Sequence, residues 1–253
     1  MHVIIPARYA STRLPGKPLA DVAGKTLIER VYQCARDSGA QRITIATDDE
    51  RIRKVAEAFG AEVCMTGNQH PSGTDRLAEA IAKLGVKPDE IVVNLQGDEW
   101  AMPPGLLRQV AETLEHHPET VMATACHRIV DFSLFIDPNA ARVVLDRDGH
   151  ALYFSRAAVP WSRDRVGKES EVPSAAYRHI AVFAYRADFV TRYCAWGPCE
   201  LEQIEQLEQL RVLWHGERIV VYVTDDPPLK SIDTPQDLER ARRYLRDRQE
   251  RQK

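Results

Sequence analysis

The sequence predicts an α/β protein with a doubly wound, mostly parallel (mixed) sheet and a smaller β-rich lobe. Three patterns support this prediction. Short runs rich in β-branched residues alternate with segments of helical periodicity in the first half of the chain. Residues 91–95 (IVVNL) form an apolar run typical of a strand covered on both faces. In the middle of the chain, a DRDG turn at 146–149 separates two strand-like runs, which predicts an antiparallel hairpin.

In the first half, strands and helices are expected to alternate. The predicted strands are residues 3–5, Arg42–Thr47, Glu62–Met65 and Ile91–Leu95. Three helices are predicted between these strands. The first carries Leu27, Val31 and Cys34 and ends at Gly39; the second starts at Asp48 or Asp49 and ends before Gly60. The third starts at Ser72, Thr74 or Asp75. Because such βα crossovers build a parallel sheet, a ligand site is expected at the carboxyl ends of the strands. The loop after residue 5, Asp48 and Asp98 should converge there.

The second half predicts a change of architecture. Residues 141–145 and 151–154 form the hairpin, and residues 178–185 form a further strand. We therefore expect a β-rich substrate-binding lobe at 128–186, and an α/β core formed by 1–127 and 187–253. A single helix is predicted at 202–214, with Ile204, Leu207, Leu210 and Leu213 on its apolar face. A late strand at Ile219–Val223 and a terminal helix at 235–248 complete the expected order.

Composition excludes several classes of protein. A chain of 253 residues with 44% hydrophobic residues can bury a sizeable core, and its net charge of −3 argues against a protein that coats nucleic acid. Five cysteines, odd in number and without C-x-x-C spacing, predict neither a disulfide framework nor a zinc site. Without an apolar run of about 18 residues or a signal-peptide pattern, we expect a soluble, cytoplasmic protein. The arginines of the terminal helix alternate with acidic residues, as on a solvated face.

The first candidate site is the loop over residues 6–19 (PARYASTRLPGKPL). It carries three cations, Arg8, Arg13 and Lys17, and its prolines and Gly16 prevent a regular helix. Guanidinium and ammonium groups at this density suit a phosphate ligand. The loop matches neither G-x-G-x-x-G nor G-x-x-x-x-G-K-[ST]. Because basic loops after strands are commonly solvated connections, both interpretations stand on the residues alone.

The second candidate site combines two aspartates. Asp98 follows the predicted strand 91–95, and Gly97 beside it allows a ligand to come close, which suits a hard cation held by oxygen ligands. Asp233 lies in the string SIDTPQDL at 231–238. Each aspartate also has a structural interpretation: Asp98 as a turn residue, and Asp233 as the cap of the terminal helix with Pro235 in its first turn.

The loop over residues 6–19 closely resembles the nucleotide-binding signature of sugar nucleotidyltransferases, in particular the bacterial 3-deoxy-manno-octulosonate (Kdo) cytidylyltransferases. Further segments resemble the same family in family order: 47–48, 64–66, 72–79, 139–145, 151–156, 160–161, 178–179, 207–214 and 233–235. The resemblance implies a sheet of the nucleotide-diphospho-sugar transferase type and a homodimer joined through the β-rich lobe. It also implies the reaction of CTP with Kdo to give CMP-Kdo and pyrophosphate for lipopolysaccharide synthesis.

The resemblance assigns roles to individual residues. It implies catalytic roles for Lys17, Arg13, Asp98 and Asp233, with Mg²⁺ bound by Asp98 and Asp233. It implies nucleotide binding by Ala7, Arg8, Arg13, Lys17, Asp48, Ser72, Gly73, Arg76 and Gln96. It implies sugar binding by Gln96, Arg156, His179, Tyr185, Glu208 and Gln209. Considered without the resemblance, His179 equally fits a core histidine, Tyr185 fits sheet packing, and Glu208 and Gln209 fit the exposed side of a helix.

The chain departs from the family pattern mainly around the expected sugar site. Trp100 stands where the family usually has proline, and Ala181 and Ala184 stand where it has glycine. Two added methyl groups can narrow a pocket, so a related acid such as 8-amino-Kdo or an acylneuraminate stays an alternative substrate. A non-catalytic nucleotide-binding homologue is the other alternative. Retention of Lys17, Asp98 and Asp233 counts against it.

Overall fold

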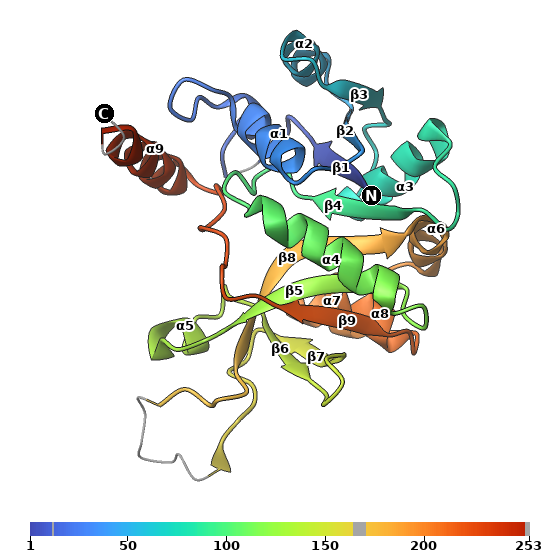
Figure 1. The fold of residues 1–253 in the computed structure, drawn as a ribbon, viewed down its shortest axis with the longest axis vertical. Helices are drawn as coiled ribbons and strands as arrows, with labels where there is room; N and C mark the ends of the chain where they lie inside the picture. Colours follow the sequence, from blue (N-terminus) through green and yellow to red (C-terminus); the bar gives the residue numbers. More distant parts are fainter. Residues whose placement is uncertain (12, 164–170, 251–253) are drawn as a thin grey trace.

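A nine-stranded mixed sheet forms the centre of the molecule (Figure 1). The computed structural model describes residues 1–11, 13–163 and 171–250, so Thr12 of the basic loop and residues 164–170 of the predicted lobe lie outside the described residues. The strands are β1 (His2–Ala7), β2 (Arg42–Thr47), β3 (Glu62–Met65), β4 (Ile91–Leu95), β5 (Met122–Arg128), β6 (Arg142–Leu145), β7 (Ala151–Ser155), β8 (Tyr177–Arg186) and β9 (Ile219–Val223).

The strand order is β3-β2-β1-β4-β8-β5-β9, and the β6–β7 hairpin joins the sheet through β6 and β8. The pairs β1–β2, β2–β3, β1–β4 and β5–β9 are parallel. β8 runs antiparallel to both β4 and β5. The predicted fold class, a doubly wound and mostly parallel mixed sheet, is therefore confirmed.

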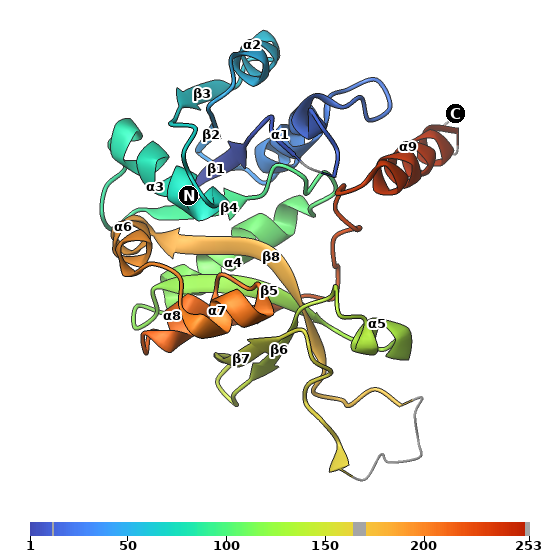
Figure 2. The ribbon, with the colours of Figure 1, turned by 180° about the vertical axis from the view of Figure 1, so that it is seen from behind.

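Helices cover both faces of this sheet. They are the 3₁₀ helix η1 (Lys17–Leu19) and the α-helices α1 (Leu27–Asp37), α2 (Glu50–Ala58), α3 (Gly73–Leu84), α4 (Pro104–His116), α5 (Phe132–Ile136), α6 (Ala187–Trp196), α7 (Glu200–Glu205), α8 (Leu210–Trp214) and α9 (Pro235–Glu250). Helices α1 and α4 lie over one face (Figure 1), and α3, α6 and α8 lie over the other (Figure 2). Each face has its own buried apolar cluster.

Local signals fixed most of these elements. The predicted bounds of β2, β3, β4 and β9 are confirmed. Asp49 caps α2, and Ser72 caps α3 by accepting a hydrogen bond from the backbone N–H of Asp75. The sequence had left Thr74 and Asp75 as alternative caps.

All five cysteines are free thiols, and none of the described helices has the length and hydropathy needed to cross a membrane.

The chain order places the ends of β1 and β4 side by side. It runs outward through β1, β2 and β3 and then returns to β4 on the other side of β1, which creates a topological switch point. Gly97 lies in the turn after β4, where a Cβ atom would lie 2.9 Å from the carbonyl oxygen of Pro6. The backbone of β1 therefore leaves no room for a side chain at Gly97, and the expected close approach of a ligand at Gly97 stays a prediction.

The predicted single helix at 202–214 is wrong. Gln206 adopts a left-handed conformation (φ 53°), which ends α7, and α8 begins only at Leu210. The break is held by Arg211, whose guanidinium binds both carboxylate oxygens of Glu202. The break between α7 and α8 leaves Leu207 buried but Ile204 70% exposed, so Ile204 is not on a buried helix face. Helical periodicity could not reveal the break, because Gln206 is neither glycine nor asparagine.

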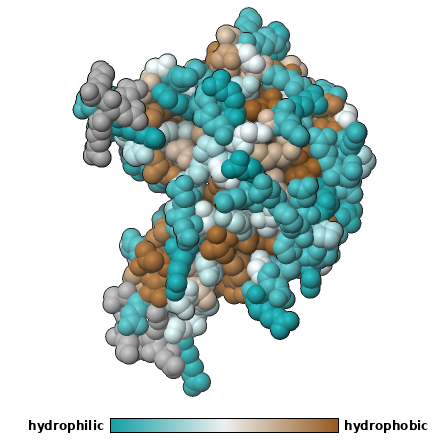
Figure 3. Space-filling model, viewed as in Figure 1, coloured by the Kyte–Doolittle hydropathy of each residue, from teal (hydrophilic) through white to brown (hydrophobic). Residues whose placement is uncertain are grey.

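The predicted hairpin is confirmed as β6 and β7, and β8 links it to the rest of the sheet. The first residues of β8 pair with β6, whereas residues 182–186 pair with β4. Apolar residues gather around α5 on this side of the molecule (Figure 3). Val130 and Ile136, at or next to α5 in the sequence, are exposed, and so is Trp161 of the predicted lobe. The division into a lobe at 128–186 and a core formed by the remaining residues stays a prediction.

Candidate functional site

Two adjoining cavities, each of about 570 Å³, lie at the carboxyl ends of β1 and β4. The basic-loop cavity is lined by Ala7, Arg8, Arg13, Lys17, Ser72, Gly73, Arg76, Gln96, Asp98 and Asp233, among others. The lobe cavity is lined by Gln96, Glu99, Arg156, Arg178, His179, Ala181, Glu208 and Gln209, among others. Gly73 and Gln96 line both cavities, so the two meet where β4 ends and α3 begins.

The basic loop is held in a defined conformation. Gly16 is left-handed (φ 67°), and a Cβ atom there would lie 3.0 Å from the hydroxyl oxygen of Tyr9. The guanidinium of Arg51 lies 3.3 Å above the centre of the Tyr9 ring. Pro18 is in the first turn of η1, which starts at Lys17. These contacts aim the Lys17 side chain towards the end of β4.

Lys17 joins the two predicted metal-binding aspartates. Its Nζ donates to Oδ2 of Asp98 at 2.7 Å and to Oδ1 of Asp233 at 2.9 Å. Arg13, which is more exposed, donates to the same Asp233 oxygen at 2.9 Å. Burial alone would lower the pKa of Lys17, but the two carboxylates outweigh burial and raise that pKa above its ordinary value. Residues 17, 98 and 233, far apart in the chain, thus form one charged cluster.

Asp233 is not the cap of the terminal helix. Thr234 has that role, because its Oγ1 accepts from the backbone N–H of Asp237, and an oxygen of Asp237 accepts from the backbone N–H of Thr234. The same Asp237 oxygen accepts from the backbone N–H of Asp233. The side chain of Asp233 is therefore left free to face Lys17 and Arg13. The sequence-based alternative that Asp233 caps α9 is wrong by one residue.

The carboxylates of Asp98 and Asp233 form a donor set that suits a hard cation. Both contact one ammonium group, and each is about a quarter exposed, which leaves room for water and ligand oxygens. Mg²⁺ in proteins is commonly held by one or two carboxylates together with phosphate oxygens and water. The residues present therefore fit this ion.

The start of α3 forms the opposite wall of the basic-loop cavity. Ser72 and Gly73 line it, and a helix N-terminus favours an anionic ligand. Arg76 is buried and donates to Thr66 and to the carbonyl oxygen of Gly67. Its other terminal nitrogen lies 3.2 Å from Oδ1 of Asp48, an ion-pair distance without hydrogen-bond geometry. Asp48 does not line the cavity, so it reaches the site only through Arg76.

His179 lines the lobe cavity from an irregular part of β8. The pairing of β8 with β5 shifts between Thr124 and Ala125, which exposes Ala181 to the cavity. His179 Nε2 lies 2.8 Å from Oγ1 of Thr124, and its ring lies between Phe154 and Phe183. Burial, together with the nearby Arg178 charge, lowers the pKa of His179 to about 3. The imidazole is therefore neutral at neutral pH.

Glu208 and Gln209 are not on an exposed helix face. Glu208 accepts a hydrogen bond of 3.0 Å from the Thr74 hydroxyl, and burial raises its pKa. Gln209 is buried, and its Nε2 atom has no hydrogen-bond partner among the described residues. A buried amide without a partner is costly, and here it borders a cavity. Tyr185 is buried and does not line the cavity.

The guanidinium of Arg156, a predicted sugar-binding residue, is largely used in hydrogen bonds to the backbone. Its guanidinium donates to the carbonyl oxygens of Pro138, Asn139, Glu205 and Gln206. The prediction missed three other charged residues that line the same cavity: Arg178, Glu99, and Glu202, which is paired with Arg211. Burial and the Asp98 carboxylate raise the pKa of Glu99 to about 8, while Arg178 partly offsets this. The positions of Arg178 and Glu99 beside His179 and Asp98 in the sequence were the only signal that could have identified these two.

The three departures from the family pattern have different surroundings. Only Ala181 lines the lobe cavity. Ala184 is completely buried in the core on the α4 face, so the expectation that its methyl group narrows a pocket is wrong. Trp100 is also buried: its Nε1 donates to the carbonyl oxygen of Lys230, and its ring packs edge-on against Tyr244 of α9. Trp100 thus joins the end of β4 to the C-terminal segment.

Comparison with known proteins gives a consistent result. A family model described as cytidylyltransferase matches residues 2–219. The chain is 52% identical to 3-deoxy-manno-octulosonate cytidylyltransferase of Vibrio cholerae over 247 residues, which cover 97% of this chain and 98% of the relative. It is 50% identical over 250 residues to the protein of that name in Histophilus somni, with 96% and 97% covered.

Solved structures agree with these sequence matches. The structure of CMP:2-keto-3-deoxy-manno-octonic acid synthetase complexed with CTP superposes with a TM-score of 0.86 at 37% identity, covering 97% of this chain and 98% of that one. A cytidylyltransferase from Leptospira borgpetersenii shares the fold alone, with a TM-score of 0.62 at 16% identity over 95% of this chain and 84% of that one.

Proposed function

We propose that this chain, which belongs to the 3-deoxy-manno-octulosonate cytidylyltransferase family, transfers the cytidylyl group of CTP to Kdo and releases pyrophosphate. The observation that carries the proposal is the cluster of Lys17, Asp98 and Asp233 in the basic-loop cavity, which adjoins the lobe cavity at Gly73 and Gln96. The product, CMP-Kdo, would serve lipopolysaccharide synthesis. The enzyme is thus assigned to the nucleotidyltransferases.

In this proposal the triphosphate of CTP occupies the basic-loop cavity. Arg8, Arg13 and Lys17 supply positive charge along one wall, and the N-terminus of α3 at Ser72 and Gly73 supplies backbone donors along the other. Charge that develops on the α-phosphate and on the leaving pyrophosphate would lie between these two walls. Groups fixed in this way stabilise a transition state without reorganising during the reaction.

The sugar acid would occupy the lobe cavity. Arg178 can bind its carboxylate, and Gln209 can donate its unused Nε2–H₂ to a hydroxyl group. Neutral His179 can accept or donate a single hydrogen bond, depending on its tautomer. Gln96 and Gly73 border both cavities, so the anomeric hydroxyl would meet the α-phosphorus beside Gln96. Attack would form the oxygen–phosphorus bond and release pyrophosphate, in line with the attacking oxygen.

We assign the metal site to Asp98 and Asp233, which would hold Mg²⁺. When bound, this ion supplies charge neutralisation at the phosphates and lowers the pKa of the attacking hydroxyl. Lys17 would hold the two carboxylates in place from the protein side. Arg13 would restrain Asp233 and can reach the leaving phosphates from the more exposed side. No protein general base is then required.

We also propose a cytoplasmic homodimer. Five free thiols suit a reducing compartment. Dimerisation through the β-rich lobe is supported by the exposed apolar side chains Val130, Ile136, Leu152 and Trp161. Sedimentation of the purified chain would test the dimer: a change of Trp161 to Glu should shift it towards monomer if this face is the interface.

The decisive experiment measures pyrophosphate release from CTP and Mg²⁺, with Kdo, 8-amino-Kdo and N-acetylneuraminate offered separately. Release with Kdo as the preferred acid supports the proposal. Release only with another acid would keep the chemistry but reassign the lobe cavity. If folded protein that binds CTP released no pyrophosphate with any of the three acids, a non-catalytic homologue would be favoured.

A further inference from the structure

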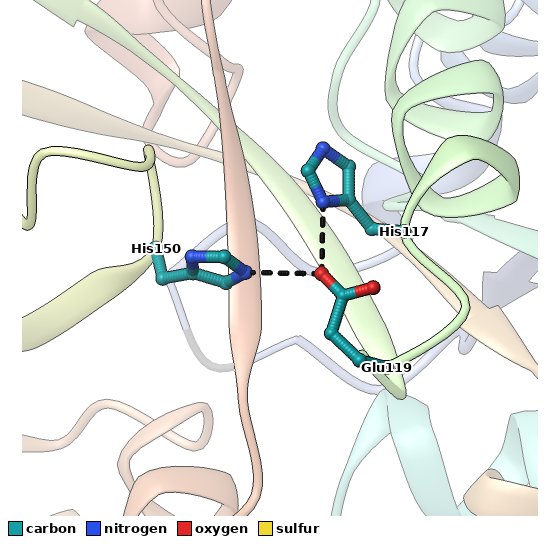
Figure 4. Close-up of side chains that lie close together, drawn as sticks. All are labelled: His117, Glu119 and His150. Atoms are coloured by element: carbon teal, nitrogen blue, oxygen red, sulfur yellow. Dashed lines mark hydrogen bonds and ion pairs between the residues drawn. The ribbon is translucent and has the colours of Figure 1, made fainter.

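A second cluster of ligating side chains lies away from both cavities. His117 ends α4, Glu119 lies in the turn before β5, and His150 immediately precedes β7. One ligand atom from each lies within 4.8 Å of the others. The two imidazoles point at the same carboxylate oxygen of Glu119 (Figure 4). None of these residues lines either cavity, and the cluster sits at the amino end of β5, opposite the proposed active site.

The spacing of the cluster suits a metal ion. His117 Nδ1 lies 3.0 Å from Oε1 of Glu119, and His150 Nε2 lies 3.4 Å from the same oxygen. Ligands of a tetrahedral Zn²⁺ ion, each about 2.1 Å from the metal, are about 3.4 Å apart. His117 and Glu119 are also partly exposed, which gives an ion a route to the buried His150.

The Nε2 atom of His150 makes an ion-pair contact with Glu119 but no hydrogen bond among the described residues. His150 is only 8% exposed, and its Nε2 is buried without a partner of hydrogen-bond geometry among the described residues. Its other nitrogen faces Oδ2 of Asp146 at 3.7 Å. Oδ1 of Asp146 is fixed by backbone N–H groups of Asp148 and His150, at 2.9 Å and 2.8 Å. A carboxylate behind the imidazole is the usual support of a metal-bound histidine.

We propose that His117 Nδ1, Glu119 and His150 Nε2 bind a divalent transition-metal ion, with Zn²⁺ the best match and water as the fourth ligand. Two imidazoles and one carboxylate form a donor set that suits such ions better than Mg²⁺. The ion would join the α4–β5 connection to the β6–β7 hairpin. His150 also bridges to Val220 of β9, so three segments would be fastened at one point. Because the cluster lines neither cavity, the ion would act on the stability of the fold and not on the proposed chemistry.

The test titrates Zn²⁺ into metal-stripped, full-length protein by calorimetry and follows thermal unfolding with and without the ion. We expect one equivalent to bind and the melting temperature to rise. His117→Gln and Glu119→Gln should each weaken binding at least tenfold and abolish the rise. His116→Gln is the matched control, because His116 is the exposed neighbour whose Nδ1 contacts the Glu112 carbonyl oxygen. Asp98→Asn should bind Zn²⁺ normally, which separates this site from the proposed Mg²⁺ site.

Co²⁺ substitution identifies the ligands. Absorption typical of nitrogen and oxygen ligands, lost in His117→Gln, would support the proposal, whereas a thiolate charge-transfer band would place the ion on one of the five free cysteines and overturn it. Equal affinity in His117→Gln, Glu119→Gln and the unaltered chain would also overturn it, as would the absence of binding. His117 and Glu119 are partly exposed, so their variants are expected to fold; His150→Gln is not needed for the conclusion.

Discussion

The two cavities differ in the chemical groups that line them, and so in the ligands that they suit. The basic-loop cavity presents accessible charge: Arg8 and Arg13 are exposed, and Lys17 lies against two carboxylates. The lobe cavity combines charged residues such as Arg178 with polar groups that burial holds neutral or leaves unpaired, such as His179 and Gln209. A polyphosphate needs compensation of several charges, whereas a sugar acid needs directional partners for its hydroxyl groups and few charges. Variants in the first cavity should therefore impair chemistry and CTP use, and variants in the second should impair use of the sugar acid.

The largest effect is expected for Asp98→Asn. The change keeps the shape of the side chain but removes one of the two proposed metal carboxylates, so kcat should fall about a thousandfold, or ~4 kcal/mol in transition-state free energy. Steady-state pyrophosphate release measures this, and circular dichroism checks folding. Asp225→Asn, at an exposed carboxylate, is the control and should keep normal activity. Near-normal activity of Asp98→Asn would remove the metal argument.

Lys17→Met should lower kcat/KM for CTP about a hundredfold, because it removes a fixed cation from the proposed phosphate site. Its effect on stability should be much smaller, as the side chain lies at the border of the cavity. Chemical denaturation and steady-state kinetics measure the two effects. Lys25→Met, at a surface pair with Glu29, is the control. If Lys17→Met lost activity and stability in equal proportion, the basic loop would be a structural element.

Gln209→Leu should raise KM for the sugar acid about tenfold and leave KM for CTP unchanged. The reason is that Gln209 lines the lobe cavity but not the basic-loop cavity, and its Nε2 atom has no hydrogen-bond partner among the described residues. Gln33→Leu on α1, which lines neither cavity, serves as the control. An equal rise in both KM values would show that the two cavities do not divide the substrates as proposed.

The buried histidine of the lobe cavity should make stability depend on pH. The folded state lowers the pKa of His179 to about 3 from an unfolded value near 6.5, so its contribution is fully present above pH 6.5 and is lost as pH falls towards 3. At pH 5 the loss should be about 2 kcal/mol. His2, whose pKa burial lowers to about 4, adds in the same direction.

Urea denaturation at pH 7.5 and pH 5 measures this loss. His179→Gln should reduce the difference in unfolding free energy between the two pH values, even if it destabilises the protein at both. His116→Gln, at an exposed site, should leave the difference as it is. An unchanged pH dependence in His179→Gln would mean that this imidazole is not held neutral in the folded protein.

The smallest effects are expected for the two alanines of β8. Ala181→Gly should change KM for the sugar acid by less than about threefold, since one methyl group contributes little discrimination. Ala184→Gly should leave that KM unchanged but lower the unfolding free energy by ~1 kcal/mol, because Ala184 is buried in the core. A larger kinetic effect from Ala184→Gly than from Ala181→Gly would reverse the assignment of these positions.

The sequence predicted the surroundings of the basic-loop cavity better than those of the lobe cavity. Beside the basic-loop cavity, β4 was predicted to the residue, because a run of β-branched residues is a local signal. β1 (His2–Ala7) instead extends past the predicted residues 3–5 into the predicted loop at 6–19, so the loop begins two residues later than expected. The expected meeting of the basic loop with Asp98 followed from parallel topology. Gln209 and Glu208 were identified as sugar-site candidates only by resemblance, and their burial follows from the break at Gln206, which no periodicity indicates. Arg178 and Glu99 were missed although they stand beside His179 and Asp98 in the sequence, because their place in the cavity depends on neighbours from distant segments.

By itself, the sequence determined the alternation of strands and helices, the fold class and the residue types that suit a nucleotide. These depend on interactions among residues close along the chain, namely periodicity, caps and turn preferences. Only the tertiary structure decided that Asp98 and Asp233 both contact Lys17 and that Thr234 caps α9. It also decided that Trp100 and Ala184 are core residues, and that His117, Glu119 and His150 meet. Such outcomes depend on contacts between segments far apart in sequence. Their free energy is set by how far each group is buried and by whether its polar atoms find a partner.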